Sequence, residues 1–344
     1  MNTPVIDWAA LARLRDAFLT GSAGQADYWE NERDLASYDV TFAQRIGWKW
    51  DHVLADLSRR GWRPPSGPLL DWGCGSGIAG RAFLDHFGAK SVSGLWLWDR
   101  SSLAMTFAAG RARQKYAGIR VTSGLPGREG ESFGGTLLLS HVLTELDATQ
   151  LDALLAVVTG AASVLWIEPG THTASRALGA VRERLREHFA IVAPCPHQGA
   201  CGLLTPGQER HWCHHFAEPP RWVFTDGDWS RFATLTGIDL RALPLSYLVL
   251  ERRADAVPAL PAGAARIIGQ PRVYKPYARL FACDATGVSD RELSKRVFPE
   301  LFRQMRKGSA PSLLELECAP GGRVLSARSL EAEANDQTKD EGAR

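Results

Sequence analysis

Short apolar runs alternate with amphipathic segments through the middle of the chain. The runs that predict strands cover residues 69–72, 92–98, 119–123, 135–140 and 162–168. Helical periodicity follows four of these runs, starting near residues 78, 101, 147 and 172. Such alternation is typical of a parallel sheet covered by helices on both faces. We therefore predict an α/β fold that binds a ligand at the carboxyl ends of its strands.

The pattern changes on either side of this region. Residues 1–62 place Trp8, Leu11, Ile46 and Trp50 at helical spacing, which predicts an N-terminal helical cap. The predicted sheet domain covers residues 63–253 and ends with a strand at 191–193, a helix near 229–235 and a strand at 246–251. Residues 194–221 are an insertion that this sheet does not need.

A second, smaller unit follows a Pro- and Ala-rich linker at 254–265. Over residues 266–328 we predict a mixed α/β appendage with strands at 266–268 and 277–284, a helix at 291–307, and a hairpin in SLLELECAPGGRVLSA. Residues 329–344 are polar, acidic and poor in apolar groups, which predicts a disordered tail.

The first predicted strand leads directly into a glycine loop, LLDWGCGSG, from Leu69 to Gly77. Gly73, Gly75 and Gly77 remove side chains where the backbone turns tightly and a ligand approaches closely. The spacing differs from the dinucleotide motif, and no Lys-Ser or Lys-Thr pair follows as in a phosphate loop. With Asp71 as its acid, the pattern resembles motif I of the class I S-adenosylmethionine-dependent methyltransferases.

A second acid stands where that resemblance requires one. The run VSGLWLWDR ends the second strand at Asp99, 22 residues after Gly77, and a carboxylate there can hold a ribose diol. The fourth strand ends at Ser140 and His141 and the fifth at Glu168, positions that face cofactor and substrate in a methyltransferase. The alternative is an ordinary strand-turn-helix without a ligand. We predict S-adenosylmethionine contacts by Asp71, the three glycines, Asp99 and Ser140.

The insertion holds Cys195, Cys201 and Cys213 within 19 residues. Gly, Pro and His surround these thiols, which favours a loop wrapped on a metal or iron–sulfur cluster over buried, unligated cysteines. The fourth ligand is left open between a local histidine and Cys283, which is separated from Cys213 by 69 residues. Closing the longer loop costs only about 1.6 kcal/mol more than a loop of 11 residues, against on the order of 10 kcal/mol for metal binding. The local candidates are His197, His211, His214 and His215.

Charge and targeting signals limit the partners and the cellular locations that we expect. Residues 261–328 hold twelve Arg or Lys against six Asp or Glu, which is compatible either with RNA contact or with a solvated basic face. No apolar run approaches the length of a membrane span, and the N-terminal residues do not resemble a presequence. We expect a cytoplasmic protein without a membrane anchor that is a monomer when free. Six cysteines without a secretory signal favour thiol or metal chemistry over disulfides.

Several motifs together resemble one family. LLDWGCGSG, SHVLTEL, IEPGT, CPHQGAC with WCHHF, and RLFACDATG are similar to the methyltransferase-like proteins of the small ribosomal subunit, which have bacterial and mitochondrial members, over about residues 30–307. The resemblance implies a 4Fe-4S cluster on Cys195, Cys201, Cys213 and Cys283, with zinc as the alternative metal. It also implies action on rRNA in the small subunit. The chain departs from the family at Lys307-Gly308-Ser309, where Trp-Gly-Asp is usual.

Two functions from different classes stay open. Amino-group methylases usually carry Asn-Pro-Pro-Tyr after the fourth strand, whereas this chain has Ser-His-Val-Leu. His141 is a weak candidate for a general base, and Glu145 and Glu168 suit supporting or capping roles better than chemistry. We therefore predict an RNA-binding assembly or translation factor that keeps its ligands for structure or sensing. The alternative is an active rRNA methyltransferase, and a zinc-bound protein methyltransferase is more distant.

Overall fold

An eight-stranded sheet occupies the middle of the chain in the computed structural model, which describes residues 5–20, 27–126, 133–252 and 260–331. Its strands are β1 (Leu69–Trp72), β2 (Leu95–Trp98), β3 (Val121–Ser123), β4 (Thr136–Ser140), β5 (Ser163–Pro169), β6 (Ala190–Ala193), β7 (His215–Phe216) and β8 (Pro244–Glu251). All but β7 lie within a few residues of the predicted strands, because buried apolar runs of this length suit a sheet covered on both faces. β7 was not predicted, and it lies within the insertion at 194–221.

The strand order is β3-β2-β1-β4-β5-β8-β6, with β7 paired to the first residues of β8. β1 to β5 pair in parallel, whereas β8 runs antiparallel to both β5 and β6. This arrangement confirms the predicted α/β fold with a largely parallel sheet. Because the parallel strands share one direction, the loops that follow β1, β2, β4 and β5 meet at one edge of the sheet.

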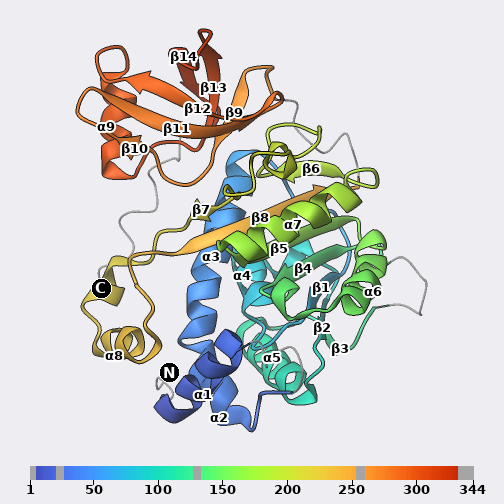
Figure 1. Ribbon diagram of the computed structural model, residues 1–344. Helices are drawn as coiled ribbons and strands as arrows, with labels where there is room; N and C mark the ends of the chain where they lie inside the picture. Colours follow the sequence, from blue (N-terminus) through green and yellow to red (C-terminus); the bar gives the residue numbers. More distant parts are fainter. Residues whose placement is uncertain (1–4, 21–26, 127–132, 253–259, 332–344) are drawn as a thin grey trace.

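Alternate strand residues face two separate cores. Leu138 of β4 packs in the core that contains α3, α4 and α5, whereas its neighbours Leu137 and Leu139 pack in the core that contains α6 and α7. The helices are α3 (Phe42–Arg59), α4 (Ile78–Phe87), α5 (Ser102–Lys115), α6 (Ala148–Thr159) and α7 (His172–Leu185). Both faces of the sheet are therefore covered (Figure 1).

The chain before β1 forms α1 (Trp8–Thr20), α2 (Glu32–Asp39) and the long α3, which runs beside the sheet (Figure 1). Asn31 caps α2 by accepting hydrogen bonds from the amides of Arg33 and Asp34. At the other end of α2, buried Asp39 pairs with Arg81 of α4 and Arg111 of α5. These ion pairs join the N-terminal helices to the helices that flank the glycine loop. The predicted cap boundary at residue 62 stays a prediction.

A second sheet follows residue 260. Its strands are β9 (Ala264–Ile267), β10 (Arg272–Val273), β11 (Tyr277–Asp284), β12 (Gly287–Ser294), β13 (Leu313–Cys318) and β14 (Val324–Ser329). The order is β10-β11-β9-β13-β14, with β12 on the other side of β11, and α9 (Pro299–Lys307) packs Phe302 and Met305 into its core. This sheet lies beyond one end of the larger sheet (Figure 1).

The predicted helix over residues 291–307 is wrong in its first part. β12 continues to Ser294, and α9 begins at Pro299, whose missing N–H suits the first turn of a helix. The strand GVSDRELS has only Val288 and Leu293 as larger apolar residues, so it lacks the period of two by which a strand is found. The predicted hairpin at 312–327 is confirmed by the antiparallel pairing of β13 and β14.

Two segment boundaries differ from the sequence pattern. β9 begins at Ala264, inside the predicted linker, and β14 ends at Ser329, inside the predicted tail. Beyond β14, the carboxylate of Glu331 accepts hydrogen bonds from the amides of Ser312 and Leu313, at 2.7 and 2.9 Å. The predictions for 254–259 and for the tail 332–344 lie outside the described residues. None of the helices in the described ranges is long and apolar enough to cross a membrane.

Buried charges join the two sheets. The guanidinium of Arg266 in β9 lies 2.8 Å from the carboxylate of Asp56 in α3 and also donates to the hydroxyl of Tyr247 in β8. Tyr247 in turn donates to Asp56 at 2.9 Å, and Arg60 lies 3.1 Å from the same carboxylate. Burial alone would raise the pKa of Asp56, but Arg266 and Arg60 outweigh it and hold that pKa well below its usual range.

Candidate functional site

The glycine loop turns from β1 into α4 with three left-handed residues. Gly73 and Gly77 have φ of 69° and 80°, and a Cβ at either position would come within 2.6 Å of Val142 or 2.9 Å of Ala108. Gly75 also has a positive φ, 50°, but a Cβ there would meet no atom within 4 Å. The outer two glycines are therefore needed for close packing, whereas Gly75 borders open space.

Asp99 closes the loop from the end of β2. One carboxylate oxygen accepts a hydrogen bond from the amide of Gly75 and the other from the amide of Ser101, each at 2.9 Å. Burial raises the pKa of Asp99, and the two amide bonds oppose that shift. Each carboxylate oxygen has a second lone pair, so the group can accept further hydrogen bonds from a ligand hydroxyl.

Asp71 lies beneath the loop and is fully buried. Its Oδ2 accepts a hydrogen bond from the amide of Gly80 at 2.9 Å, which ties β1 to the first turn of α4. Burial raises the pKa of Asp71 to about 7. Among the described residues, Asp71 Oδ1 and the hydroxyl of Ser76 in the loop have no hydrogen-bond partner. Two buried polar groups are thus left unpaired beside the loop.

The end of β4 meets α3 rather than open solvent. The indole of Trp50 donates to the hydroxyl of Ser140 at 3.0 Å, and Lys49 Nζ lies 3.3 Å from His141 Nε2. Burial and the neighbouring Lys49 hold the pKa of His141 well below its usual range, and burial lowers the pKa of Lys49 to about 7. His141 has a φ of 57°, a left-handed conformation that is uncommon outside glycine. A neutral imidazole is therefore held in a fixed place beside the glycine loop.

The two glutamates expected in supporting roles are placed differently. Glu168 is fully buried and accepts from the amides of Val142 and Leu143 and from the indole of Trp166. Burial raises the pKa of Glu168 to about 7. One oxygen of this carboxyl group, Oε1, holds the turn after β4. Burial also raises the pKa of Glu145 to about 7.

Sequence patterns missed the contribution of the N-terminal helices to this site. Lys49 reaches His141 from α3, and Tyr28 lies under the guanidinium of Arg100, 5.4 Å from its ring centroid. The pKa of Tyr28 is raised, first by burial and then by Glu145 and other neighbours that include Asp99. A basic residue on the otherwise apolar face of α3 is the one signal that could have indicated Lys49.

Four cysteines from two distant parts of the chain gather between the sheets. Cys201 and Cys213 of the insertion pack with Cys283 of β11 in one cluster with Leu203 and Ile268. The pKa of Cys213 is raised far above its usual range, first by burial and then by the thiols of Cys195, Cys283 and Cys201. Within the described ranges, however, no group of three or more His, Cys, Asp or Glu side chains has the arrangement of a metal-ion site as it stands.

The local histidines surround these thiols unequally. His197 Nε2 lies 3.6 Å from the sulfur of Cys283, and His215 Nε2 lies 3.6 Å from the sulfur of Cys213. His211 stacks on Phe281 and His214 on Trp212. The two histidines that contact sulfur therefore remain candidate ligands beside Cys283. Cys74 and Cys318, expected to be structural, lie in the loop core and in β13.

A cation also reaches the cysteines. Arg182 of α7 is almost fully buried, and its Nε donates to the sulfur of Cys195 at 3.3 Å. Its other end donates to the carbonyl of Gly199 at 2.7 Å, and its neighbour Glu183 accepts from the amide of Cys201 at 3.1 Å. A positive charge is therefore aimed at the sulfur of Cys195.

Comparisons with known proteins identify the family. A sequence profile described as mitochondrial small ribosomal subunit Rsm22 matches residues 62–309, and no curated protein matches the chain significantly. Three similar solved structures contain S-adenosylhomocysteine. NodS of Bradyrhizobium japonicum is 12% identical, with a TM-score of 0.36 and coverage of 69% of this chain and 98% of that one. TrmK of M. capricolum is 8% identical, with a TM-score of 0.33 and coverage of 59% of this chain and 67% of that one. ChlM of Synechocystis PCC 6803 is 13% identical, with a TM-score of 0.34 and coverage of 71% of this chain and 99% of that one. Scores this low support no inference about function. The profile spans most of the chain and agrees with the motifs that resemble methyltransferase-like small-subunit proteins, so this protein belongs to the Rsm22 family.

Proposed function

We propose that this protein binds S-adenosylmethionine and an iron–sulfur cluster and acts on the small ribosomal subunit through rRNA, as an assembly or translation factor. Membership of the Rsm22 family supports the partner. We further propose that the free protein is a cytoplasmic monomer. The convergence of Cys283 from the second sheet with the three cysteines of the insertion carries the proposal.

The glycine loop fits S-adenosylmethionine. Gly75 borders open space, and the carboxylate of Asp99 is already fixed by the Gly75 amide at the edge of that space. The unpaired Asp71 Oδ1 and Ser76 hydroxyl are groups that a polar ligand or its waters would satisfy. When bound, this cofactor supplies an electrophilic methyl group. The chain's part is to hold the ribose at Asp99 and to leave room above Gly75.

The four thiols fit a 4Fe-4S cluster, which is held by four cysteine thiolates. Three of them, Cys201, Cys213 and Cys283, are gathered among Leu203, Ile268 and Phe281, and such an apolar shell limits access of water to a cluster. Arg182 donates to the sulfur of Cys195, and hydrogen bonds to ligand sulfur are a known way to set a cluster's potential. Zinc would take the same four ligands and is the alternative metal.

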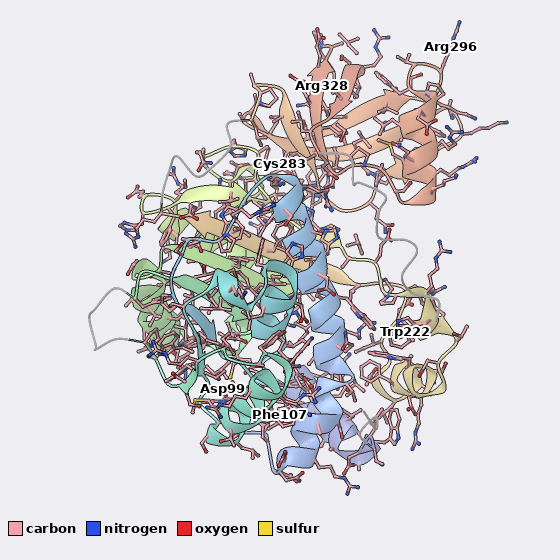
Figure 2. All side chains as sticks on the ribbon, turned by 180° about the vertical axis from the view of Figure 1, so that it is seen from behind. Asp99, Phe107, Trp222, Cys283, Arg296 and Arg328 are labelled. Carbon is pink, nitrogen blue, oxygen red and sulfur yellow. The ribbon has the colours of Figure 1, made fainter. Side chains whose placement is uncertain are left out.

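The two candidate sites lie apart. Asp99 is at one end of the larger sheet's layer and Cys283 is at the other, next to the second sheet (Figure 2). A group bound at the cysteines would therefore join the two sheets without reaching the cofactor loop. This separation favours a structural or sensing role for the cluster over a role in methyl transfer.

Anaerobic purification tests the proposal. We expect about four iron and four sulfide per chain with the broad visible absorbance of a cluster, S-adenosylmethionine binding by calorimetry, and co-sedimentation with small subunits. A colourless protein with one zinc would overturn the cluster. An iron-loaded protein that does not co-sediment with small subunits would overturn the partner instead.

An active rRNA methyltransferase is the second candidate, because Lys49 and His141 place two nitrogen groups near the loop. Incubating small-subunit rRNA with methyl-labelled S-adenosylmethionine tests it. Transfer that is lost in His141→Ala, in a variant that still binds the cofactor, would support this reading, and absence of transfer would exclude it. A zinc-bound protein methyltransferase is a distant third possibility, and the metal analysis decides it.

A further inference from the structure

An exposed and a half-buried tyrosine stack at the tip of the β10–β11 hairpin. The ring centroids of Tyr274 and Tyr277 lie 4.8 Å apart with an interplanar angle of 28°, and Tyr274 remains 45% exposed. The amide of Tyr274 donates to the carbonyl of Tyr277 at 2.9 Å, which fixes the turn that presents both rings. The guanidinium of Arg279 lies 5.8 Å from the ring centroid of Tyr277. The hairpin tip is therefore a preformed aromatic step with a cation beside it.

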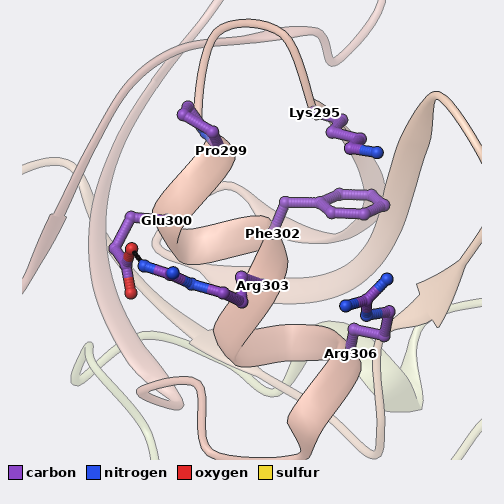
Figure 3. Close-up of a pocket in the computed structure, with 6 residues that line it drawn as sticks. All are labelled: Lys295, Pro299, Glu300, Phe302, Arg303 and Arg306. Carbon is purple, nitrogen blue, oxygen red and sulfur yellow. Dashed lines mark ion pairs between the residues drawn. The ribbon is translucent and has the colours of Figure 1, made fainter.

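A hollow of about 430 Å³ lies along α9. Its floor is Phe302, with the ammonium of Lys295 5.7 Å from the ring centroid and the guanidinium of Arg306 at the next turn of the helix (Figure 3). Arg303 also lines the hollow but pairs with Glu300. The hollow thus combines an apolar base with two exposed cations.

The hairpin tip and the hollow form one continuous surface. The amide of Lys295 donates to the carbonyl of Pro276, between the two tyrosines, at 3.0 Å, and Tyr277 pairs with Ser294 across β11 and β12. Within the part of the chain that the structure describes, no carboxylate forms an ion pair with the cations of this surface. These cations are Lys275, Arg279, Lys295, Arg296, Arg306 and Lys307.

We propose that this tyrosine–α9 surface, made by Tyr274, Tyr277, Lys295 and Arg306 with the cations around them, binds unpaired nucleotides of RNA. Cations that lack acidic partners suit phosphates, whose contacts supply most of the affinity for nucleic acid. Exposed aromatic rings suit single strands, because unpaired bases can stack on them whereas duplex bases stay stacked on one another. The inference rests on the proposed function and names the part of that protein which contacts rRNA.

Fluorescence anisotropy of the full-length protein with a labelled oligouridine of about 12 nucleotides tests the proposal. Tyr274→Ala should weaken binding about 5- to 150-fold, because stacking is lost, and Tyr274→Phe should bind like the parent. Lys295→Glu with Arg306→Glu should lower the slope of log affinity against log salt by about 1.4, or about 0.7 for each phosphate contact in a single strand.

The matched control is Arg323→Glu with Arg328→Glu. This pair makes the same change in charge at β14 and at the residue before it, and Figure 2 shows Arg328 well separated from Arg296 of the proposed surface. It should leave both affinity and slope unchanged. A perfect duplex of mixed sequence should compete poorly for the labelled strand.

Several results would overturn the proposal: full affinity in Tyr274→Ala, equal loss in the β14 control, or competition by the duplex as strong as by the single strand. Co-sedimentation of the same variants with small subunits separates this inference from the proposed function. Normal co-sedimentation by variants that bind oligouridine normally would place rRNA contact elsewhere and leave the proposed function intact. If the parent bound oligouridine but not small subunits, the proposed function would fall and this surface would stand.

Discussion

Replacement of Asp99 gives the sharpest test of the glycine loop. Its carboxylate accepts the amides of Gly75 and Ser101 at 2.9 Å, so it is oriented before any ligand arrives. Hydrogen bonds to a charged group are worth about 1.5–3 kcal/mol. If the ribose diol of S-adenosylmethionine uses this carboxylate, Asp99→Ala should weaken binding by about 10- to 150-fold.

The fold should survive this change at some cost. Asp99→Ala leaves the amides of Gly75 and Ser101 without their acceptor, which costs about 1–3 kcal/mol for each group that stays buried. Asp99→Asn keeps a carbonyl oxygen for one of the two amides and should therefore be the more stable variant. Calorimetry gives the affinity, and thermal unfolding without cofactor gives the stability of each variant.

A matched control separates the two effects. Asp226 caps α8 (Gly227–Thr236) by accepting a hydrogen bond from the amide of Trp229 at 3.0 Å, away from the loop. Asp226→Ala should lose about 1 kcal/mol of stability with no change in affinity for S-adenosylmethionine. Parental affinity in Asp99→Ala, or no measurable binding by the parent, would refute the assignment of Asp99.

Further variants test the cysteines, the Arg266–Asp56 contact between the sheets, and Lys49 of α3. Cys283→Ser should lose most of its iron, since one iron of the cluster would lack its thiolate ligand, whereas His197→Ala should keep its iron. Iron analysis that shows the reverse pattern would assign the fourth ligand to His197. Arg266→Met should lose about 3–5 kcal/mol in urea unfolding, and adding Asp56→Leu should recover part of the loss, because the buried carboxylate of Asp56 loses its nearest guanidinium and is then only partly compensated by Arg60; equal stability of the single and double variants would argue against this account. Burial lowers the pKa of Lys49 to about 7 in the folded protein. Between about pH 7 and 10 the unfolded chain therefore binds one more proton than the folded chain, and this group makes the free energy of unfolding rise by about 1.4 kcal/mol per pH unit. Lys49→Met should flatten that slope, and an unchanged pH profile would show that the lysine stays charged.

The larger sheet could be predicted because its signals are local. The runs that became β1 to β5 are short and apolar, and glycine and Asp99 follow them at fixed distances. The amphipathic segments between them gave α4 to α7 within a few residues. The pattern could not show to which face of the sheet a strand side chain points. Asp71 also ties β1 to α4 through the amide of Gly80, a contact that the motif does not show, because a strand residue's face depends on neighbours distant in sequence.

The missed features depend on contacts across the chain. Lys49 reaches His141 over 92 positions and Arg266 reaches Asp56 over 210, and no local period marks either pair. β12 was misread as helix because its apolar residues do not alternate and its pairing with β11 determines its form. The gathering of Cys283 with Cys213 was open at the level of sequence, where local histidines competed with it.

The position of Cys283 also determines when the set of four thiols can be complete. The three cysteines of the insertion emerge from a ribosome well before Cys283, because 69 residues separate Cys213 from it. Cys283 pairs across the sheet with Arg266, whose charge is matched by Asp56 in α3, so docking of β9 brings the last thiol to the others. A chain that stops before β11 holds only three of these four thiols. Cys283 can therefore join the other three thiols only after synthesis has passed β11 and the second sheet has docked on the first.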